Sequence, residues 1–304
     1  MNSHEFPPVP TSSHDPDLLY SIVLVLTPTR PTTVRATVGD QAHAAFLRTV
    51  QESDPALAEA LHFPNLPARP FTVSPLLGVG PARDGQVDLS PELDYFLRFT
   101  VLYPLIFERF MARFLHGEGR PVVRLGHALL LIKEILVTPG SHPWAGYTSW
   151  TQLAAEARPE PEIVLDFTSP TAFGFGQKEW GKKVVVLPQP DLVFGSLART
   201  WNNLAPPHLQ VDRDALLAYL EEHAVVKRLA GLETKMLHFS RAPQVGFVGR
   251  VTYGLMAENE PARCQLDALA DFAFYAGVGM KTTMGMGQCR KMNNEQWDNG
   301  TMNQ

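Results

Sequence analysis

The sequence predicts an α+β protein built from two tandem ferredoxin-like domains, each with the element order βαββαβ. Its 304 residues suffice for two domains of ordinary size, and an apolar content of 45% can fill two cores. Short apolar strands alternate with amphipathic helices in both halves, less regularly in the second. We therefore expect domains at 18–150 and 151–292, between a flexible N-terminus (1–17) and a disordered polar tail (293–304).

The first four elements come from short, clearly bounded patterns. LLYSIVLVL (18–26) is an apolar, β-branched run that ends at TPTRP, which predicts a buried strand. Residues 40–53 carry apolar side chains at helical spacing, and 55–62 form a second short helical segment. RPFTVSPLLG (69–78) then predicts a strand that ends in a glycine turn.

Three further elements complete the first repeat. DYFLRFTVL (94–102) predicts a strand, and YPLIFERFMARFLHG (103–117) an amphipathic helix that ends at Gly117. HALLLIKEILV (127–137) predicts the closing strand.

The second half begins with a strand at 162–170 and a segment at 183–188 that can extend a hairpin. Residues 190–204 form a helix that a proline and an aspartate introduce. A helix at 211–224 is an addition to the simple repeat.

The last three elements lead to the C-terminus. VGFVGRVTYGLM (245–256) alternates like a strand, and 262–277 forms a helix that runs into a glycine-rich loop. A short strand at 287–292 closes the second repeat.

Charge and composition restrict the class of partner. The net charge is -5, with 11 Lys/Arg against 14 Asp/Glu in residues 1–150 and 15 against 17 in 151–304. Neither half is a basic domain, so a polyanion must meet a local basic patch. The two cysteines, Cys264 and Cys289, form no disulfide framework or zinc pattern. The chain shows neither the pattern of a signal peptide nor an apolar run of membrane-spanning length, so we expect a cytoplasmic protein without a membrane partner.

The loop GVGMKTTMGMGQCR (277–290) has an unusual density of glycine. A phosphate loop requires Gly-Lys-Ser/Thr to open a helix after a strand, whereas here Met280 separates Gly279 from Lys281 and the loop follows a helix. Its place after a helix also argues against a dinucleotide-binding fingerprint, which should begin a βαβ unit. Two interpretations remain equally open: amides and a lysine that meet a phosphate backbone, or a tight turn that packs a helix on a sheet.

The longer stretch FAFYAGVGMKTTMGMGQCR (272–290) resembles the C-terminal glycine-rich motif of the RAMP superfamily. More narrowly, it resembles CRISPR-associated endoribonucleases that cut precursor CRISPR RNA within its repeats. The other matching stretches are LHFPNLPARPFTVSPL (61–76), HPWAG (142–146), DFTSPTAF (166–173), PDLVFGSL (190–197) and GFVGRVTY (246–253). The resemblance covers nearly the whole chain, and the tandem ferredoxin-like architecture of that family agrees with the element order above.

The resemblance implies a metal-independent reaction with no cofactor. The RNA 2′-hydroxyl attacks the adjacent phosphate, which yields a 2′,3′-cyclic phosphate and a 5′-hydroxyl. Such a reaction needs a group that moves protons, for which histidine is suited, and a cation for the transition-state charge. The acids and histidines show no metal-ligand spacing such as HExxH.

Carried over by the resemblance, the catalytic histidine is His62 and a nearby cation is Arg69. His43 on the first helix is the second candidate histidine. The alternative roles are structural: His62 can cap a helix end, and His43 can lie on a solvated helix face. Some relatives use a tyrosine from the first helix, but here Tyr20 lies in the first strand, so the third catalytic role has no candidate.

The candidate RNA contacts centre on Lys281. It is accompanied by the loop glycines, two threonines and two arginines, namely Gly277, Gly279, Thr282, Thr283, Gly285, Gly287, Arg290 and Arg250. Arg250 can equally be a solvated edge charge. Trp144, Trp150, Trp180 and Trp201 can stack on bases or belong to the core.

The expected partner is CRISPR repeat RNA, both as precursor and as mature guide RNA. A CRISPR effector complex and a second copy of the chain are further candidate partners. The main alternative function is a non-catalytic RAMP subunit that binds guide RNA in such a complex. A general RNA-binding ferredoxin-like module is a third, although the aromatic RNP-type strand is absent from the sequence.

Overall fold

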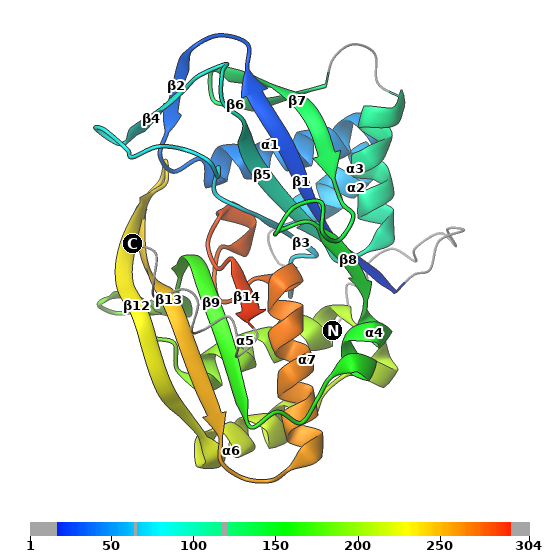
Figure 1. Cartoon of the computed structure of the whole chain (residues 1–304), viewed down its shortest axis with the longest axis vertical. Helices are drawn as coiled ribbons and strands as arrows, with labels where there is room; N and C mark the ends of the chain where they lie inside the picture. The colour runs from blue at the N-terminus through cyan, green and yellow to red at the C-terminus, as the bar shows by residue number, and fades with distance from the viewer. Residues whose placement is uncertain (1–16, 64–65, 117–120, 293–304) are drawn as a thin grey trace.

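The computed structural model describes residues 17–63, 66–116 and 121–292 and places two α+β halves end to end (Figure 1). The segments 1–16 and 293–304, which include most of the predicted flexible N-terminus and the whole predicted tail, lie outside the described residues. Among the described helices, none combines the length and the apolar character that crossing a membrane requires.

The N-terminal half is built on one antiparallel sheet with the strand order β3-β5-β1-β7-β6, and β8 pairs with β1. Its strands are β1 (Leu18–Pro28), β3 (Phe71–Val73), β5 (Tyr95–Val101), β6 (Val122–Leu125), β7 (Ala128–Leu136) and β8 (Gly146–Ser149). Its helices are α1 (Gly39–Ser53), α2 (Pro55–His62) and α3 (Pro104–His116). A small separate sheet pairs β2 (Thr32–Arg35) with β4 (Gln86–Leu89).

Phe46 fixes helix α1 on this sheet. Its ring lies 4.4 Å from that of Phe71 on β3, 5.4 Å from Phe99 on β5 and 5.3 Å from Phe110 on α3. All four phenylalanines are fully buried, so the position and rotation of α1 are set by close aromatic packing.

The C-terminal half has the sheet order β12-β13-β9-β14. Its strands are β9 (Glu162–Thr171), β12 (Ala224–His238), β13 (Pro243–Leu255) and β14 (Cys289–Met292), with a hairpin of β10 (Phe173–Lys178) and β11 (Gly181–Val185). Its helices are α4 (Trp150–Glu156), α5 (Pro190–Leu204), α6 (Arg213–His223) and α7 (Glu260–Ala276), with short 3-10 turns η1 (Pro207–Leu209) and η2 (Thr282–Met284). Buried Trp150, Trp201 and Phe272 pack between α4, α5 and α7, with centroid distances of 4.9 to 5.1 Å.

Each βαββαβ repeat has four strands. In both sheets they lie in the order second, third, first, fourth, which is β3-β5-β1-β7 in the N-terminal half and β12-β13-β9-β14 in the C-terminal half. Most predicted elements are confirmed within a few residues, and 55–62 and 190–204 coincide with α2 and α5. The strand predicted at 69–78 is wrong in extent, because only Phe71–Val73 pairs as a strand.

Strand β12 is the main element that the prediction missed. Its 15 residues pair with β13 along most of their length and supply the second strand of the C-terminal repeat. Because β12 is an edge strand and most of its residues are exposed, its sequence AVVKRLAGLETKMLH lacks the alternation of apolar and polar residues that marks a half-buried strand.

Candidate active site

The glycine-rich loop (277–288) leaves the end of α7 and lies between the two halves of the molecule (Figure 1). Gly277, Gly279, Gly285 and Gly287 all have positive φ, between 64° and 90°. A Cβ at Gly279 would lie 2.4 Å from the carbonyl oxygen of Ala172, and one at Gly287 would lie 2.2 Å from that of Val278. These two positions therefore accept no side chain, and the tight-turn interpretation accounts for their glycines.

The loop amides are largely engaged within the protein. The N–H groups of Gly277, Gly279 and Gly287 donate to the carbonyl of Ala273, the hydroxyl of Ser196 and the carbonyl of Pro170. These glycines thus hold the shape of the loop through bonds within the protein.

The tip of the loop packs against the N-terminal half. A Cβ on Gly39, the first residue of α1, would lie only 1.7 Å from the carbonyl oxygen of Met284. On the other side, Gly285 approaches the backbone of Pro75, with 3.3 Å from an added Cβ to the Pro75 nitrogen. Turn η2 is therefore held against both the start of α1 and the segment that follows β3.

His43 on α1 touches this loop directly. Its Nδ1 atom lies 3.0 Å from the carbonyl oxygen of Thr283. Because a carbonyl only accepts hydrogen bonds, Nδ1 carries the proton, and in the neutral ring Nε2 keeps its lone pair. The ring also lies 5.5 Å from that of Phe71. His43 is thus a half-buried imidazole with a defined tautomer.

The surroundings of His43 favour its neutral form. Burial lowers its pKa most strongly, and the positive charges of Arg69 and His62 lower it further. The hydrogen bond to Thr283 acts in the opposite direction. The structure therefore brings the three predicted catalytic residues into one electrostatic neighbourhood.

His62 and Arg69 approach from the end of α2. His62 is the last residue of that helix and is exposed, whereas Arg69 is half-buried and donates from Nη1 to the carbonyl of Leu61. Burial lowers the pKa of Arg69. Arg69 is thus a cation anchored one residue away from His62, and the His62 side chain is open to solvent.

Lys281 lies at the tip of the loop with an unusual backbone. Its φ of 58° is left-handed, which costs a residue with a side chain roughly 1–3 kcal/mol. The Nζ atom lies 4.9 Å from the ring centroid of Phe239. Burial and the charges of Lys182 and Arg241 lower its pKa, while Asp40 raises it. Lys281, Lys182 and Arg241 form a local basic cluster in a chain that is negative overall.

Arg250 and Arg290 lie on the C-terminal sheet, where both are register partners of Asp166 on β9. Arg290 Nη2 is 3.6 Å from the Asp166 carboxylate, and its guanidinium lies 5.0 Å from the ring of Trp144. The guanidinium of Arg290 therefore has partners within the protein.

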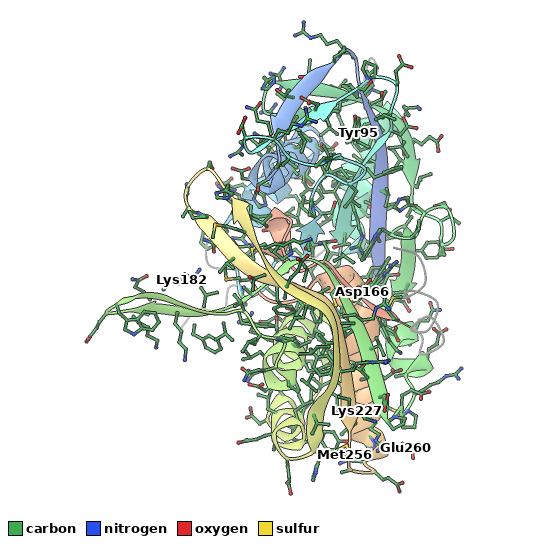
Figure 2. The ribbon with its side chains drawn as sticks, turned by 60° about the vertical axis from the view of Figure 1, so that its left-hand side comes forward. Tyr95, Asp166, Lys182, Lys227, Met256 and Glu260 are labelled. Atoms are coloured by element: carbon green, nitrogen blue, oxygen red, sulfur yellow. The ribbon has the colours of Figure 1, made fainter. Side chains whose placement is uncertain are left out.

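The two core tryptophans, Trp150 and Trp201, are buried, whereas Trp180 is 73% exposed. Trp180 lies at the turn of the β10–β11 hairpin, which projects from the body of the molecule and carries Lys182 (Figure 2).

Comparisons with known proteins identify the family and the fold of the chain. The family model for the Cas6 N-terminal domain matches residues 18–155, and that for the CRISPR-associated endoribonuclease Cas6 matches 165–289. The chain belongs to the Cas6 family.

A Cas6 endoribonuclease of Streptococcus thermophilus is 31% identical over 121 residues, which span 46% of that relative. A Cas6 product complex superposes with a TM-score of 0.76 at 27% identity, over 91% of this chain and 100% of the other. Thermus thermophilus Cas6 superposes with a TM-score of 0.69 at 26% identity, over 92% of this chain and 100% of the other. As in these Cas6 structures, the fold is a pair of ferredoxin-like domains, which confirms the predicted fold class.

In this Cas6 family member, the sequence did not predict a role for Arg98. Arg98 on β5 is completely buried and donates from Nε to Ser21 Oγ (2.7 Å) and from Nη1 to Gln288 Oε1 (2.6 Å). Its Nη2 donates to the carbonyl of Phe274, near the end of α7. Its guanidinium also lies 4.7 Å from the ring of Trp144 and 4.3 Å from that of Phe274.

Arg98 therefore joins the N-terminal half to the last turns of α7 and to Gln288 at the end of the glycine-rich loop. Burial lowers its pKa to about 9, which leaves it charged at neutral pH. The sequence signal for it was a single arginine inside the apolar strand YFLRFTV, where an unpaired charge is costly.

Proposed function

We propose that this chain is a metal-independent endoribonuclease that cleaves CRISPR precursor RNA within its repeats and leaves a 2′,3′-cyclic phosphate and a 5′-hydroxyl. The observation that carries the proposal is the hydrogen bond between His43 and Thr283 (3.0 Å), which directs a neutral imidazole with a free Nε2 beside the Lys281 loop. The match to the Cas6 endoribonuclease family supports the same activity.

In the proposed mechanism, His43 Nε2 takes the proton of the attacking 2′-hydroxyl. A lowered pKa suits this role, because the base must be unprotonated at neutral pH. The resemblance placed His62 first, but its exposed position at the end of α2 better suits the general acid that protonates the leaving 5′-oxygen. Arg69 then stabilises the charge that develops on the phosphate.

Lys281 is the proposed phosphate grip. Its strained backbone supports a functional role, and Lys182 and Arg241 add positive potential nearby. Thr282 and Thr283 follow it in the chain, and Arg250 and Arg290 are further candidate contacts on the C-terminal sheet. The proposed partner is repeat RNA, in line with the relative that was solved as a product complex.

The experiment is single-turnover cleavage of the host repeat RNA in EDTA, with analysis of both product ends. We expect cutting at one site, a cyclic phosphate on the upstream product and no cutting when the nucleotide 5′ of that site lacks its 2′-hydroxyl. Cleavage that persists with the 2′-deoxy substrate would show that a different nucleophile acts. Tight binding of unmodified repeat RNA without cleavage would indicate the alternative function, a non-catalytic guide-RNA subunit.

A further inference from the structure

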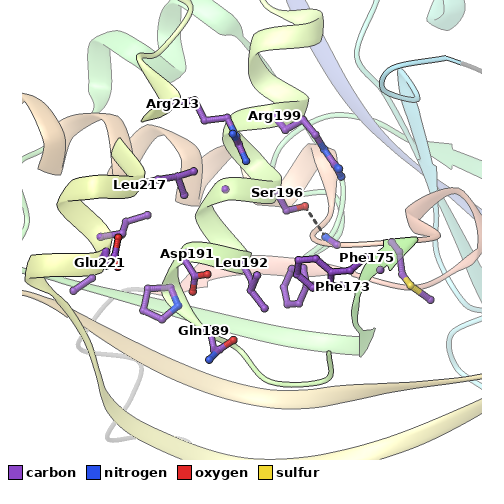
Figure 3. Close-up of a pocket in the computed structure, with 17 residues that line it drawn as sticks. Phe173, Phe175, Gln189, Asp191, Leu192, Ser196, Arg199, Arg213, Leu217 and Glu221 are labelled. Carbon is purple, nitrogen blue, oxygen red and sulfur yellow. Dashed lines mark hydrogen bonds between the residues drawn. The ribbon is translucent and has the colours of Figure 1, made fainter. Parts of the chain in front are cut away.

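A pocket of about 730 Å³ lies beside the glycine-rich loop, on the side away from the N-terminal half (Figure 3). Its walls come from the base of the β10–β11 hairpin, from α5 and α6, and from Gly279 and Met280 of the loop. None of the proposed catalytic residues lines it. It is therefore a separate cavity that shares one wall with the proposed active site.

The shared wall fixes the pocket relative to Lys281. The amide of Gly279 donates to Ser196 Oγ on α5 at 3.0 Å, a bond drawn in Figure 3. Met280 also lines the pocket, and its sulfur would lie 3.3 Å from a Cβ at Gly174 on the hairpin. Lys281 follows Met280 directly in the chain. An RNA strand whose phosphate is bound by Lys281 would therefore place a neighbouring nucleotide at the mouth of the pocket.

The lining carries three kinds of group that suit a nucleotide. Phe175 offers an aromatic ring that is 42% exposed and has Lys183 Nζ 5.2 Å from its centroid. Exposed Arg199 and Arg213 lie on one side, and the carboxylates of Asp191 and Glu221 lie on another (Figure 3). Aromatic rings stack on bases, and guanidinium groups bind phosphates.

The two carboxylates narrow the choice of ligand. They would repel a phosphate but accept hydrogen bonds from the amino group of a base. A cavity lined by cations alone would suit any stretch of backbone, whereas this mixed lining suits a whole nucleotide with phosphate and base at opposite ends.

We infer that the pocket holds one unpaired nucleotide of the substrate RNA, next to the segment gripped by Lys281, and prefers a base with an exocyclic amino group over uracil. The inference rests on the proposed function and adds a sequence preference to it. Phe175 stacks on the base, Arg199 and Arg213 bind its phosphate, and Glu221 and Asp191 accept from its amino group.

The test uses repeat RNA with a 2′-deoxy nucleotide at the cut site, so that binding is measured without cleavage. Fluorescence anisotropy compares the wild type with Phe175→Ala, Arg199→Ala and Glu221→Gln. Exposed Arg124→Ala and Glu222→Gln serve as matched controls outside the pocket, and thermal melting checks that each variant folds. We expect Phe175→Ala to weaken binding about 5- to 150-fold, the range for one base stacked on an aromatic ring.

A second arm locates the nucleotide. Single abasic sites are placed one at a time around the cut site. At one position, the abasic RNA should bind the wild type and Phe175→Ala with equal affinity. At that same position, replacing a base that has an exocyclic amino group by uracil should weaken binding to the wild type but not to Glu221→Gln. The inference is overturned if Phe175→Ala and Arg199→Ala bind like the controls, or if no abasic position removes the effect.

These outcomes differ from a failure of the proposed function. If the wild type cuts repeat RNA but the pocket variants bind normally, only the pocket inference is wrong. If the wild type neither binds nor cuts any repeat RNA, the proposed function fails first. Binding of a free mononucleotide that leaves RNA affinity unchanged would also overturn the inference, because the pocket would then serve a separate ligand.

Discussion

The Nδ1 atom of His43 lies 3.0 Å from the carbonyl oxygen of Thr283, which is 240 residues later in the chain. This bond joins a helix of the first domain to the glycine-rich loop of the second. The same loop also carries Lys281, so the proposed base is bonded to the loop that contains the proposed phosphate grip. Changes in the loop should therefore affect both RNA binding and the chemical step.

Replacing His43 by alanine should abolish most of the cleavage while RNA binding persists. Loss of a general base typically costs 10²–10⁴-fold in rate, so we expect a fall of about that size in single-turnover cleavage. His62→Ala should also slow the reaction, because it removes the proposed acid. His208→Ala, an exposed histidine on η1, serves as the control and should cut at the wild-type rate. A full-rate His43→Ala enzyme would refute the assignment of this base.

Substituting Arg69 should raise the pKa of His43. The Arg69 charge disfavours the imidazolium, so its removal in Arg69→Met makes protonation of His43 easier. A histidine-resolved NMR titration should place the His43 midpoint at higher pH than in the wild type. The acidic limb of the cleavage profile should move in the same direction, because the base then loses its proton only at higher pH. Arg113→Met, which removes an arginine paired with Glu52, should leave the His43 midpoint unchanged.

Lys281→Gly should weaken RNA binding without straining the loop. Glycine adopts the left-handed φ of 58° readily, so the substitution removes the cation and relieves the backbone. We expect lower affinity together with a fall of about 1 in the slope of log affinity against log salt, as for the loss of one phosphate contact. Lys133→Ala, on β7 and paired with Asp94, should keep the wild-type slope. An unchanged slope in Lys281→Gly would argue against a phosphate contact.

Gly39→Ala should separate α1 from the loop. The added methyl would lie 1.7 Å from the carbonyl oxygen of Met284, so η2 must shift away from His43. A displacement of about 1 Å in an active site can cost on the order of 10²-fold in rate, and we expect a loss of that order in cleavage. Gly80→Ala is the matched control, because nothing lies within 4 Å of the position that its methyl group would occupy. Equal rates in the two variants would mean that the contact between α1 and the loop is unimportant for catalysis.

Arg98→Met should destabilise the protein and uncouple the two domains. It leaves Gln288 Oε1 and the carbonyl of Phe274 buried without their donor, at about 1–3 kcal/mol for each unsatisfied group. Denaturant unfolding should show a lower midpoint, and the transition of the two domains should lose cooperativity. Arg124→Met, at an exposed position of β6, should unfold like the wild type. A midpoint equal to that of this control would show that Arg98 does not hold the domains together.

Local patterns in the sequence predicted most of the fold. The helical spacing in 40–53 and 190–204 and the apolar runs in 18–26 and 94–102 are properties of single segments, and each segment has the predicted structure. Edge strand β12 was missed because it is exposed along most of its length and carries charges and a glycine. Its strand conformation depends on pairing with β13 rather than on a local pattern.

By itself, the sequence determined the two repeats and the glycine-rich loop near the C-terminus, and its resemblance to a known family supplied a short set of candidate residues that includes His43, His62, Arg69 and Lys281. Only the tertiary structure decided how these residues relate. It hydrogen-bonds His43 to Thr283, leaves His62 exposed and connects buried Arg98 to α7 and to Gln288 at the end of the loop. The physical reason is that hydrogen bonds and desolvation between residues 175 or more positions apart leave no periodic signal in the chain, since they arise only when the two halves of the molecule pack against each other.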